Sequence, residues 1–224
     1  MLRIGHRGAA GHAVENTLRA IQLAIDLRVD FVEIDVQQLR DGSLVVYHDK
    51  LLDRLTNVSG YLGELTYDQV KHLRLVDGPD IIPTLQDACS LVRDSTVGLL
   101  VEIITFGSEL DALSMVSSIL PTQQCIFSSF CHACIANVKQ KNSAIKTVAL
   151  MEGIPVHLEP LIRDTECDYL GLGFESVSAN VIQEAKRLGV QVLVWTVDDS
   201  REIERARSLG VEGIISNYPE RIKK

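Results

Sequence analysis

The sequence predicts an α/β protein, a single (β/α)8 barrel that spans residues 1–224. Short apolar runs alternate with amphipathic helical patterns along the chain, which is typical of parallel strands joined by crossover helices. Eight strand candidates can be counted, the number that closes such a barrel. An open doubly wound sheet is the alternative, but it usually carries a G-x-G-x-x-G loop after its first strand, and Gly5-His6-Arg7-Gly8 does not match that pattern.

The predicted elements follow one another at regular intervals. The strand candidates lie near residues 2, 31, 98, 124, 146, 169, 191 and 213. Helical patterns cover residues 15–27, 84–93, 108–120, 132–141, 179–188 and 200–209, with a weaker segment at 156–163 and a final turn at 218–223. Thr84 can cap one of these helices, and Gly189 and Gly210 follow the last two as C-terminal caps do.

The second strand, residues 31–36, has two unusual features. Its alternation places Glu33 and Asp35 on the same face, where two carboxylates are costly unless they are paired or bind a cation. Asp41-Gly42 is a hairpin signal, so residues 43–47 are expected to return antiparallel. The βα rhythm then lapses from about residue 50 to 83, apart from a short helix at 67–72, which predicts a small insertion after this strand.

Composition and charge restrict the functional class. A net charge of −8 and a pI of about 5.2 argue against a sequence-independent nucleic-acid binder, whereas a small anionic substrate stays compatible because a metal or an arginine can reverse the local field. No apolar run reaches the roughly 18 residues of a membrane span, and the first residues do not resemble a signal peptide. We therefore expect a cytoplasmic protein without stable membrane insertion, and a homo-oligomer is compatible with the sequence.

The cysteines are expected to be reduced core residues. Their number is odd, and most stand among apolar neighbours: Cys89, Cys125, Cys131, Cys134 and Cys167. Cys131-His132-Ala133-Cys134 has C-x-x-C spacing, but a zinc site needs a second pair or a spaced histidine pair, and the sequence offers neither.

Polar side chains follow several of the predicted strands. Active sites of this fold collect at the carboxyl ends of the strands, so these side chains should share one rim. They are His6, Arg7, Glu33, Asp35, Glu102, Trp195 and Asn217.

The residue types on this rim indicate metal-assisted phosphodiester cleavage. Three acidic side chains form a hard oxygen site suited to Mg²⁺ or Ca²⁺. His6 and His48 are candidates for general acid and base near neutral pH, and Arg7 offers a planar fork for phosphate. A divalent ion can polarise a phosphoryl oxygen and lower the pKa of a coordinated hydroxyl.

Each of these residues also has a structural interpretation. An isolated histidine is more often hydrogen-bonded than catalytic, which assigns structural roles to His12, His72, His132 and His157. Glu33 alone could form an ion pair with Arg7, and Trp195 alone is more often a core residue than a platform for substrate. The spacing of the whole set favours a site more strongly than any single member does.

Motifs along nearly the whole chain resemble those of the glycerophosphodiester phosphodiesterases. They are His6-Arg7-Gly8, Glu15-Asn16-Thr17, Glu33-Ile34-Asp35-Val36, Asp41-Gly42, His48-Asp49, Leu52-Asp53-Arg54-Leu55-Thr56, Gly60, Leu65-Thr66, Pro83-Thr84-Leu85, Val101-Glu102-Ile103 and Gly213-Ile214-Ile215-Ser216-Asn217-Tyr218-Pro219. The resemblance implies a (β/α)8 barrel with a small insertion after the second strand, and an enzyme of lipid and glycerol metabolism.

The resemblance also implies roles for individual residues. The metal ligands would be Glu33, Asp35 and Glu102, the acid/base pair His6 and His48, and the phosphate ligand Arg7. Trp195, at the end of a predicted strand, is a further candidate for substrate binding. The implied reaction is metal-dependent hydrolysis, with Mg²⁺ or Ca²⁺, of a small-molecule glycerophosphodiester to sn-glycerol 3-phosphate and an alcohol. One histidine would deprotonate the glycerol 2-hydroxyl for attack on phosphorus, and the other would protonate the leaving alcohol.

Three positions depart from the family pattern and keep two other hypotheses open. Ile104 stands where the family usually has a lysine that helps to hold the phosphate, Asn217 stands where aspartate is common, and Val14 where proline often is. One alternative is a lysophospholipid head-group hydrolase of the lysophospholipase D type, which would need an apolar groove. The other, motivated by Ile104, is a weakened barrel that only binds a phosphate-bearing ligand.

Overall fold

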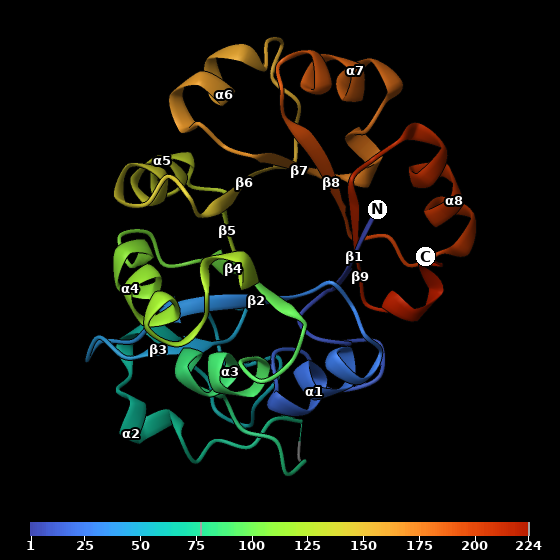
Figure 1. The fold of residues 1–224 in the computed structure, drawn as a ribbon. Helices are drawn as coiled ribbons and strands as arrows, with labels where there is room; N and C mark the ends of the chain where they lie inside the picture. Colours follow the sequence, from blue (N-terminus) through green and yellow to red (C-terminus); the bar gives the residue numbers. More distant parts are fainter. Residues whose placement is uncertain (77, 224) are drawn as a thin grey trace.

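The computed structural model describes residues 1–76 and 78–223 and is a closed parallel barrel surrounded by helices (Figure 1). The barrel strands are β1 (Leu2–Gly5), β2 (Phe31–Gln38), β4 (Gly98–Ile103), β5 (Cys125–Ser129), β6 (Lys146–Met151), β7 (Tyr169–Gly173), β8 (Gln191–Trp195) and β9 (Gly213–Ser216). Neighbouring strands pair in parallel, and β1 pairs with both β2 and β9, which closes the ring. The predicted eight-stranded barrel is therefore confirmed.

The hairpin predicted after the second strand is present as an additional strand. In β3 (Leu44–Val46), Val46 pairs antiparallel with Val36 near the end of β2. The chain then forms η1 (Leu62–Glu64) and α2 (Tyr67–Val70) before it returns to the barrel. This stretch packs on the hairpin in a separate hydrophobic cluster, which consists of Leu39, Val45, Tyr47, Leu52, Leu62, Val70, Leu75 and Ile82.

Helices cover the outside of the barrel (Figure 1). They are α1 (Leu18–Asp26), α3 (Leu85–Val92), α4 (Glu109–Ile119), α5 (His132–Lys141), α6 (Glu159–Thr165), α7 (Ala179–Arg187) and α8 (Ser200–Leu209), with short 3-10 turns at η2 (Thr122–Gln124), η3 (Phe174–Ser176) and η4 (Pro219–Arg221). Most predicted elements are reproduced to within two residues at each end, which is the usual uncertainty of helix boundaries.

The first helix begins three residues later than the sequence pattern predicts. Asn16 has a φ of 58°, in the left-handed region, and Thr17 is extended, so the chain cannot be helical there. The Thr17 hydroxyl accepts a hydrogen bond from the Ala20 amide at 3.1 Å and caps the helix. The expected cap at Thr84 is confirmed, because its hydroxyl accepts from the Asp87 amide while the Asp87 carboxylate accepts from the Thr84 amide.

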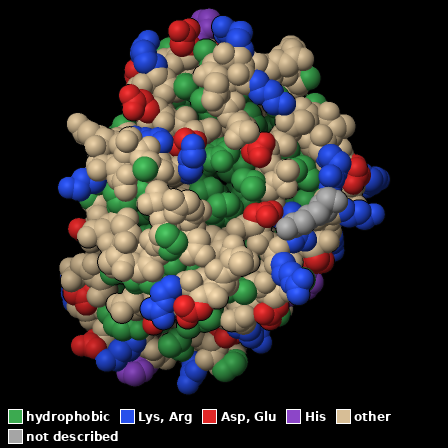
Figure 2. Space-filling model, in the orientation of Figure 1, with side chains coloured by type: hydrophobic (Ala, Val, Ile, Leu, Met, Phe, Trp, Pro, Cys, Tyr) green, Lys and Arg blue, Asp and Glu red, His purple; other side chains and the backbone are tan. Residues whose placement is uncertain are grey.

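The core has two layers around the strands. A cluster inside the barrel consists of Ile4, Leu100, Ile126, Val148, Leu150, Leu193 and Ile215. Larger clusters fill the space between the strands and the outer helices. In Figure 2 hydrophobic side chains gather in the hollow over the barrel, whereas acidic and basic side chains are interspersed around it. The interior is thus a packed core on which polar groups at the strand ends can be held rigidly.

Two expectations about the chain as a whole can be compared with the structure. All five cysteines are free, and four of them are buried. Within residues 1–76 and 78–223, none of the helices combines the length and the apolar character needed to cross a membrane.

Candidate active site

Three carboxylates from two neighbouring strands converge at one end of the barrel. Glu33 and Asp35 lie two residues apart on β2, and Asp35 is the register partner of Glu102 on β4. Each offers an oxygen atom, and these atoms all lie within 4.8 Å of one another. Alternation along one strand and parallel pairing with the next therefore produce the acidic cluster that the sequence predicts.

The cluster holds more negative charge than its protein surroundings neutralise. Burial, followed by repulsion from Asp35 and Glu102, raises the pKa of Glu33 well above its ordinary value. Burial and repulsion from Asp35 raise the pKa of Glu102 to about 8. The Oε1 atom of Glu33 is buried and has no hydrogen-bond partner among the described residues. Crowded carboxylate oxygens with an unpaired acceptor fit a divalent cation that prefers oxygen ligands.

Arg7 is the basic residue that contacts this cluster. Its backbone amide, held at a φ of 49°, donates to Glu33 Oε2 at 2.7 Å. Its guanidinium lies 3.3 Å from Asp35 Oδ2 and donates to Glu15 Oε1 at 2.7 Å. The side chain is thus held by two carboxylates, and a guanidinium has five N–H donors, so donors are left for a ligand.

His6 is held by a short polar chain from the last barrel strands. Its Nδ1 lies 2.8 Å from Asn217 Oδ1, while Asn217 Nδ2 donates to Asp198 Oδ2 at 2.7 Å. The Asn217 backbone amide and the Ser216 hydroxyl both donate to the other oxygen of Asp198, at 2.8 Å each. Because the amide nitrogen of Asn217 faces Asp198, its oxygen accepts from Nδ1–H of His6, and Nε2 is the ring nitrogen that carries the lone pair.

The surroundings of His6 favour its neutral form. Burial, and then the positive charge of Arg7, lower the pKa of His6, against smaller opposing effects that include the Asn217 hydrogen bond. A neutral imidazole with a free Nε2 can accept a proton near pH 7.

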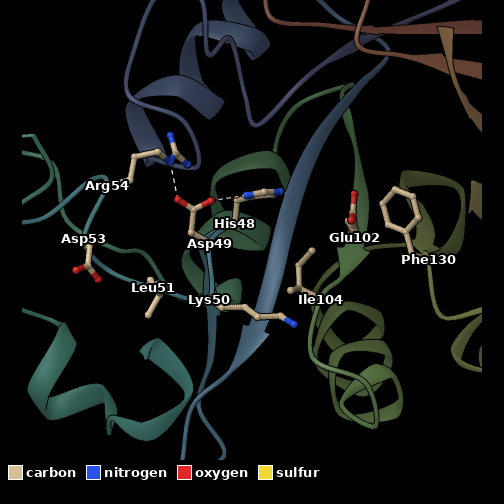
Figure 3. Close-up of a pocket in the computed structure, with 9 residues that line it drawn as sticks. All are labelled: His48, Asp49, Lys50, Leu51, Asp53, Arg54, Glu102, Ile104 and Phe130. Atoms are coloured by element: carbon tan, nitrogen blue, oxygen red, sulfur yellow. Dashed lines mark hydrogen bonds and ion pairs between the residues drawn. The ribbon is translucent and has the colours of Figure 1, made fainter. Parts of the chain in front are cut away.

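His48 belongs to an ion-pair network, and Figure 3 shows the part of it that runs from His48 through Asp49 to Arg54. Its Nδ1 lies 2.7 Å from Asp49 Oδ1, and the other Asp49 oxygen accepts from Arg54 Nε at 2.5 Å. Arg54 also donates to both oxygens of Glu15, at 2.7 and 2.9 Å, and Glu15 contacts Arg7. The network fixes the His48 ring with Nδ1 toward Asp49, so its Nε2 is also left for a ligand.

A cavity of about 70 Å³ brings most of the predicted site residues together. It is lined by His6, Arg7, Glu33, His48, Leu100, Glu102, Ser128, Phe130, Leu150, Trp195 and Ile215. Asp35 joins this group through the acidic cluster. All seven residues singled out from the sequence as catalytic, metal-binding or substrate-binding therefore lie around one site.

Several polar groups at this cavity were not foreseen from the sequence. The hydroxyl of Ser128 is buried without a partner among the described residues, as is the indole N–H of Trp195, a residue that the sequence does predict, so both groups can hydrogen-bond to a ligand. Asn16 holds Asp35 in place, because its Nδ2 donates to Asp35 Oδ2 at 2.7 Å and its Oδ1 accepts from the Asp35 amide. Phe130 meets Trp195 edge to face, with ring centroids 5.6 Å apart. Ser128 and Asp198 each stand at or just beyond a predicted strand end, which is the signal that could have identified them.

Comparisons with known proteins agree with this geometry. The model of the glycerophosphoryl diester phosphodiesterase family matches residues 6–221. A glycerophosphodiester phosphodiesterase of Caldanaerobacter subterraneus subsp. tengcongensis is 30% identical over 230 residues, which cover 98% of this chain and 95% of that protein.

Two solved structures have the same fold. An Oleispira antarctica phosphodiesterase in complex with the product sn-glycerol 3-phosphate superposes with a TM-score of 0.92 at 26% identity, covering 98% of this chain and 94% of that one. A glycerophosphodiester phosphodiesterase from Thermotoga maritima has a TM-score of 0.83 at 25% identity, covering 98% and 96%. The chain therefore belongs to the glycerophosphoryl diester phosphodiesterase family and is an enzyme of that kind.

Proposed function

We propose that this protein hydrolyses glycerophosphodiesters to sn-glycerol 3-phosphate and an alcohol, with a divalent cation held by Glu33, Asp35 and Glu102 and with His6 and His48 as the acid/base pair. The observation that carries the proposal is the meeting of three crowded carboxylates and two imidazoles at one cavity. A Mg²⁺ or Ca²⁺ ion bound there would polarise the phosphoryl group and offset its negative charge.

His6 is the better candidate for the general base. Its lowered pKa keeps the ring neutral near pH 7, and the Asn217 contact directs the lone pair of Nε2 away from the Asp198 chain. In the proposed first step, Nε2 of His6 removes the proton of the glycerol 2-hydroxyl, whose oxygen then forms a bond to phosphorus.

His48 is then the general acid. Asp49 lies 2.7 Å from its Nδ1 and orients the ring, so that Nε2 is left to face the substrate. His48 donates a proton to the alcohol oxygen as the phosphorus–oxygen bond breaks, which leaves a cyclic phosphate on glycerol. Water opens this ring with the two proton transfers reversed and returns both histidines to their starting states.

The contacts of Arg7 suit it to orient the phosphate. Two carboxylates hold the guanidinium at the cavity wall, so it can donate to phosphoryl oxygens without first losing side-chain freedom. Trp195 and Phe130 form an apolar wall beside it, and the unpaired indole N–H of Trp195 can donate to a substrate oxygen.

The first test measures sn-glycerol 3-phosphate release from glycerophosphocholine with Mg²⁺, with Ca²⁺ and with EDTA. We expect product with at least one ion and none with EDTA. Binding of glycerol 3-phosphate without any turnover would instead favour the weakened binding barrel that Ile104 suggests.

The second test addresses the histidines and the attacking group. His6→Ala and His48→Ala should each lower turnover on the order of 100-fold or more, with the fold intact by circular dichroism. A 2-deoxy analogue of the substrate should resist cleavage, because it lacks the hydroxyl that attacks phosphorus. Normal turnover of that analogue would indicate direct attack by water.

A further inference from the structure

A wide groove opens from the acidic cluster toward the residue 50–83 stretch and the loop after β4. It consists of two cavities of about 500 and 620 Å³ that share Lys50, Glu102, Ile104 and Phe130, and we call it the apolar groove. Glu102 belongs both to this groove and to the acidic cluster, so the groove is continuous with the reaction site. Figure 3 shows Ile104 and Phe130 on either side of Glu102.

The walls of the groove expose an unusual amount of apolar surface. Leu51, Tyr61, Phe106 and Phe130 line it with relative exposures of 43, 56, 64 and 42%. Among residues 1–76 and 78–223, the three aromatic side chains that count as exposed all lie on this groove. Apolar side chains that gather around a concave surface indicate a ligand with apolar surface, since leaving them in water is costly.

The reaction site itself is smaller and more polar. The cavity of about 70 Å³ that holds His6 and His48 is small and carries carboxylates, imidazoles and a guanidinium. Under the proposed function, this cavity takes the phosphate and the glycerol whose hydroxyl attacks. The alcohol moiety on the far side of the phosphorus must then extend outward, and the groove that begins at Glu102 is the wide space next to it.

The charged side chains that line the groove have both signs: Lys50 and Arg54 are basic, and Asp49, Asp53, Glu64 and Glu102 are acidic. Lys50 lies where the two cavities meet and extends toward Ile104 (Figure 3). No carboxylate of the described residues lies within 4.0 Å of its ammonium group, so its charge is not cancelled by an ion pair. Its aliphatic stem adds apolar surface to the groove. The neighbouring cation Arg54, by contrast, is paired with Asp49 and Glu15.

We propose that the apolar groove binds the alcohol moiety of the substrate and that the enzyme prefers glycerophosphodiesters whose alcohol carries an alkyl or acyl chain. This inference rests on the proposed function, because it assumes that the phosphodiester is cleaved at the acidic cluster. The products would be sn-glycerol 3-phosphate and an apolar alcohol, which leaves along Ile104, Phe106 and Tyr61.

A homologous series of substrates tests the inference. Methyl, butyl and octyl esters of sn-glycerol 3-phosphate differ only in the chain, and they are compared with glycerophosphocholine below the micelle concentration. We expect kcat/KM to rise about 10-fold or more from methyl to octyl, because a fully buried CH₂ group contributes about 0.8 kcal/mol and an open groove buries only part of the chain. Glycerophosphocholine should be cleaved more slowly than the octyl ester, because its alcohol has no alkyl chain to bury on the apolar walls.

Variants of the groove locate the effect. Phe106→Ser and Tyr61→Ser should abolish most of the gain for the octyl ester and leave the methyl ester unchanged, since neither residue touches the reaction site. Leu110→Ser is the matched control, because Leu110 is 42% exposed on α4 and does not line the groove. It should behave as the parent protein does toward both esters.

The outcomes separate this inference from the proposed function. Cleavage of all esters at rates independent of chain length overturns the groove assignment and leaves the proposed function intact. An equal rise in kcat/KM with a chain on the sn-1 oxygen of glycerol also overturns the groove assignment, because the effect would then not depend on a chain in the alcohol moiety. If no ester is cleaved, the proposed function fails, and calorimetry with the octyl and methyl esters then tests whether the groove binds the chain. Tighter binding of the octyl ester that is lost in Phe106→Ser supports the groove assignment. Equal binding of the two esters refutes it.

Discussion

Metal-free protein should lose stability as the pH rises from 5 to 8, and Glu102 is the clearest cause. Its pKa is raised from 4.5 to about 8 by burial and by Asp35, so the folded state holds the proton more tightly than the unfolded chain does. The stabilisation is complete below the pKa that Glu102 has in the unfolded chain, and it is lost as the pH rises to the pKa that Glu102 has in the folded protein. In that interval the unfolded chain has already released the proton that the folded protein still holds. Glu33 has a pKa raised in the same direction and should add to the effect.

The size of the effect follows from the two pKa values of Glu102. One pKa unit corresponds to about 1.4 kcal/mol, so a rise from 4.5 to about 8 amounts to a loss on the order of 5 kcal/mol across that range. That is a large fraction of the 5–15 kcal/mol by which typical domains are stable. A divalent ion that displaces the proton should reverse the loss, and its apparent affinity should rise about tenfold per pH unit below pH 8 for each proton released.

Denaturation by urea in EDTA, at pH 5, 6, 7 and 8, measures the effect, and Trp195 serves as the probe because it is the one tryptophan of the chain. Glu102→Gln is the matched variant, since it keeps the shape of the side chain and removes the charge. We expect this variant to be more stable than the parent at pH 8, less dependent on pH, and weakly stabilised by Mg²⁺ or Ca²⁺. A parent protein whose metal-free stability is constant from pH 5 to 8, or a variant with the same pH dependence, would refute the reasoning.

Three further predictions concern single side chains. Asn217→Ala should lower kcat about 10-fold with little change in KM, because the Nδ1–H of His6 loses its acceptor, and Asn217→Asp should restore most of the rate; steady-state kinetics checks this. Ile104→Lys should tighten glycerol 3-phosphate binding several-fold in calorimetry without loss of folding, because Ile104 lines the groove and is only partly buried. Thr84→Ala should cost about 1 kcal/mol in urea denaturation and leave activity unchanged, because it removes only the cap of α3.

Local patterns were enough to predict most of the fold. The apolar runs specify the strands, and the cap at Thr84 and the helix stop at Gly210 follow from short-range chemistry. The start of the first helix could not be predicted from its apolar face, because the left-handed conformation of Asn16 is set by its contacts with Asp35, which lies 19 residues away in the chain. Tertiary contacts decided the outcome there.

In the candidate active site, too, some features follow from local sequence patterns and others depend on tertiary contacts. Alternation on β2 was enough to bring Glu33 and Asp35 together, and the barrel then placed Glu102 beside them. The link from His6 through Asn217 to Asp198 spans most of the chain, and no periodic pattern in the sequence encodes it. The apolar groove could not be predicted either, because exposure and concavity depend on how distant loops fold.

The ion pairs from His48 through Asp49, Arg54 and Glu15 to Arg7 limit how this enzyme can be re-engineered. The stretch of residues 50–83 resembles an exchangeable module, since it supplies most of a separate hydrophobic cluster and lies outside the ring of strands. Arg54, however, is the only member of residues 50–76 and 78–83 in the network, and it tethers the hairpin to Glu15 across the rim. A graft from another barrel that lacks an arginine at this position would keep the fold but remove the link between Asp49, which holds His48, and Glu15, which holds Arg7.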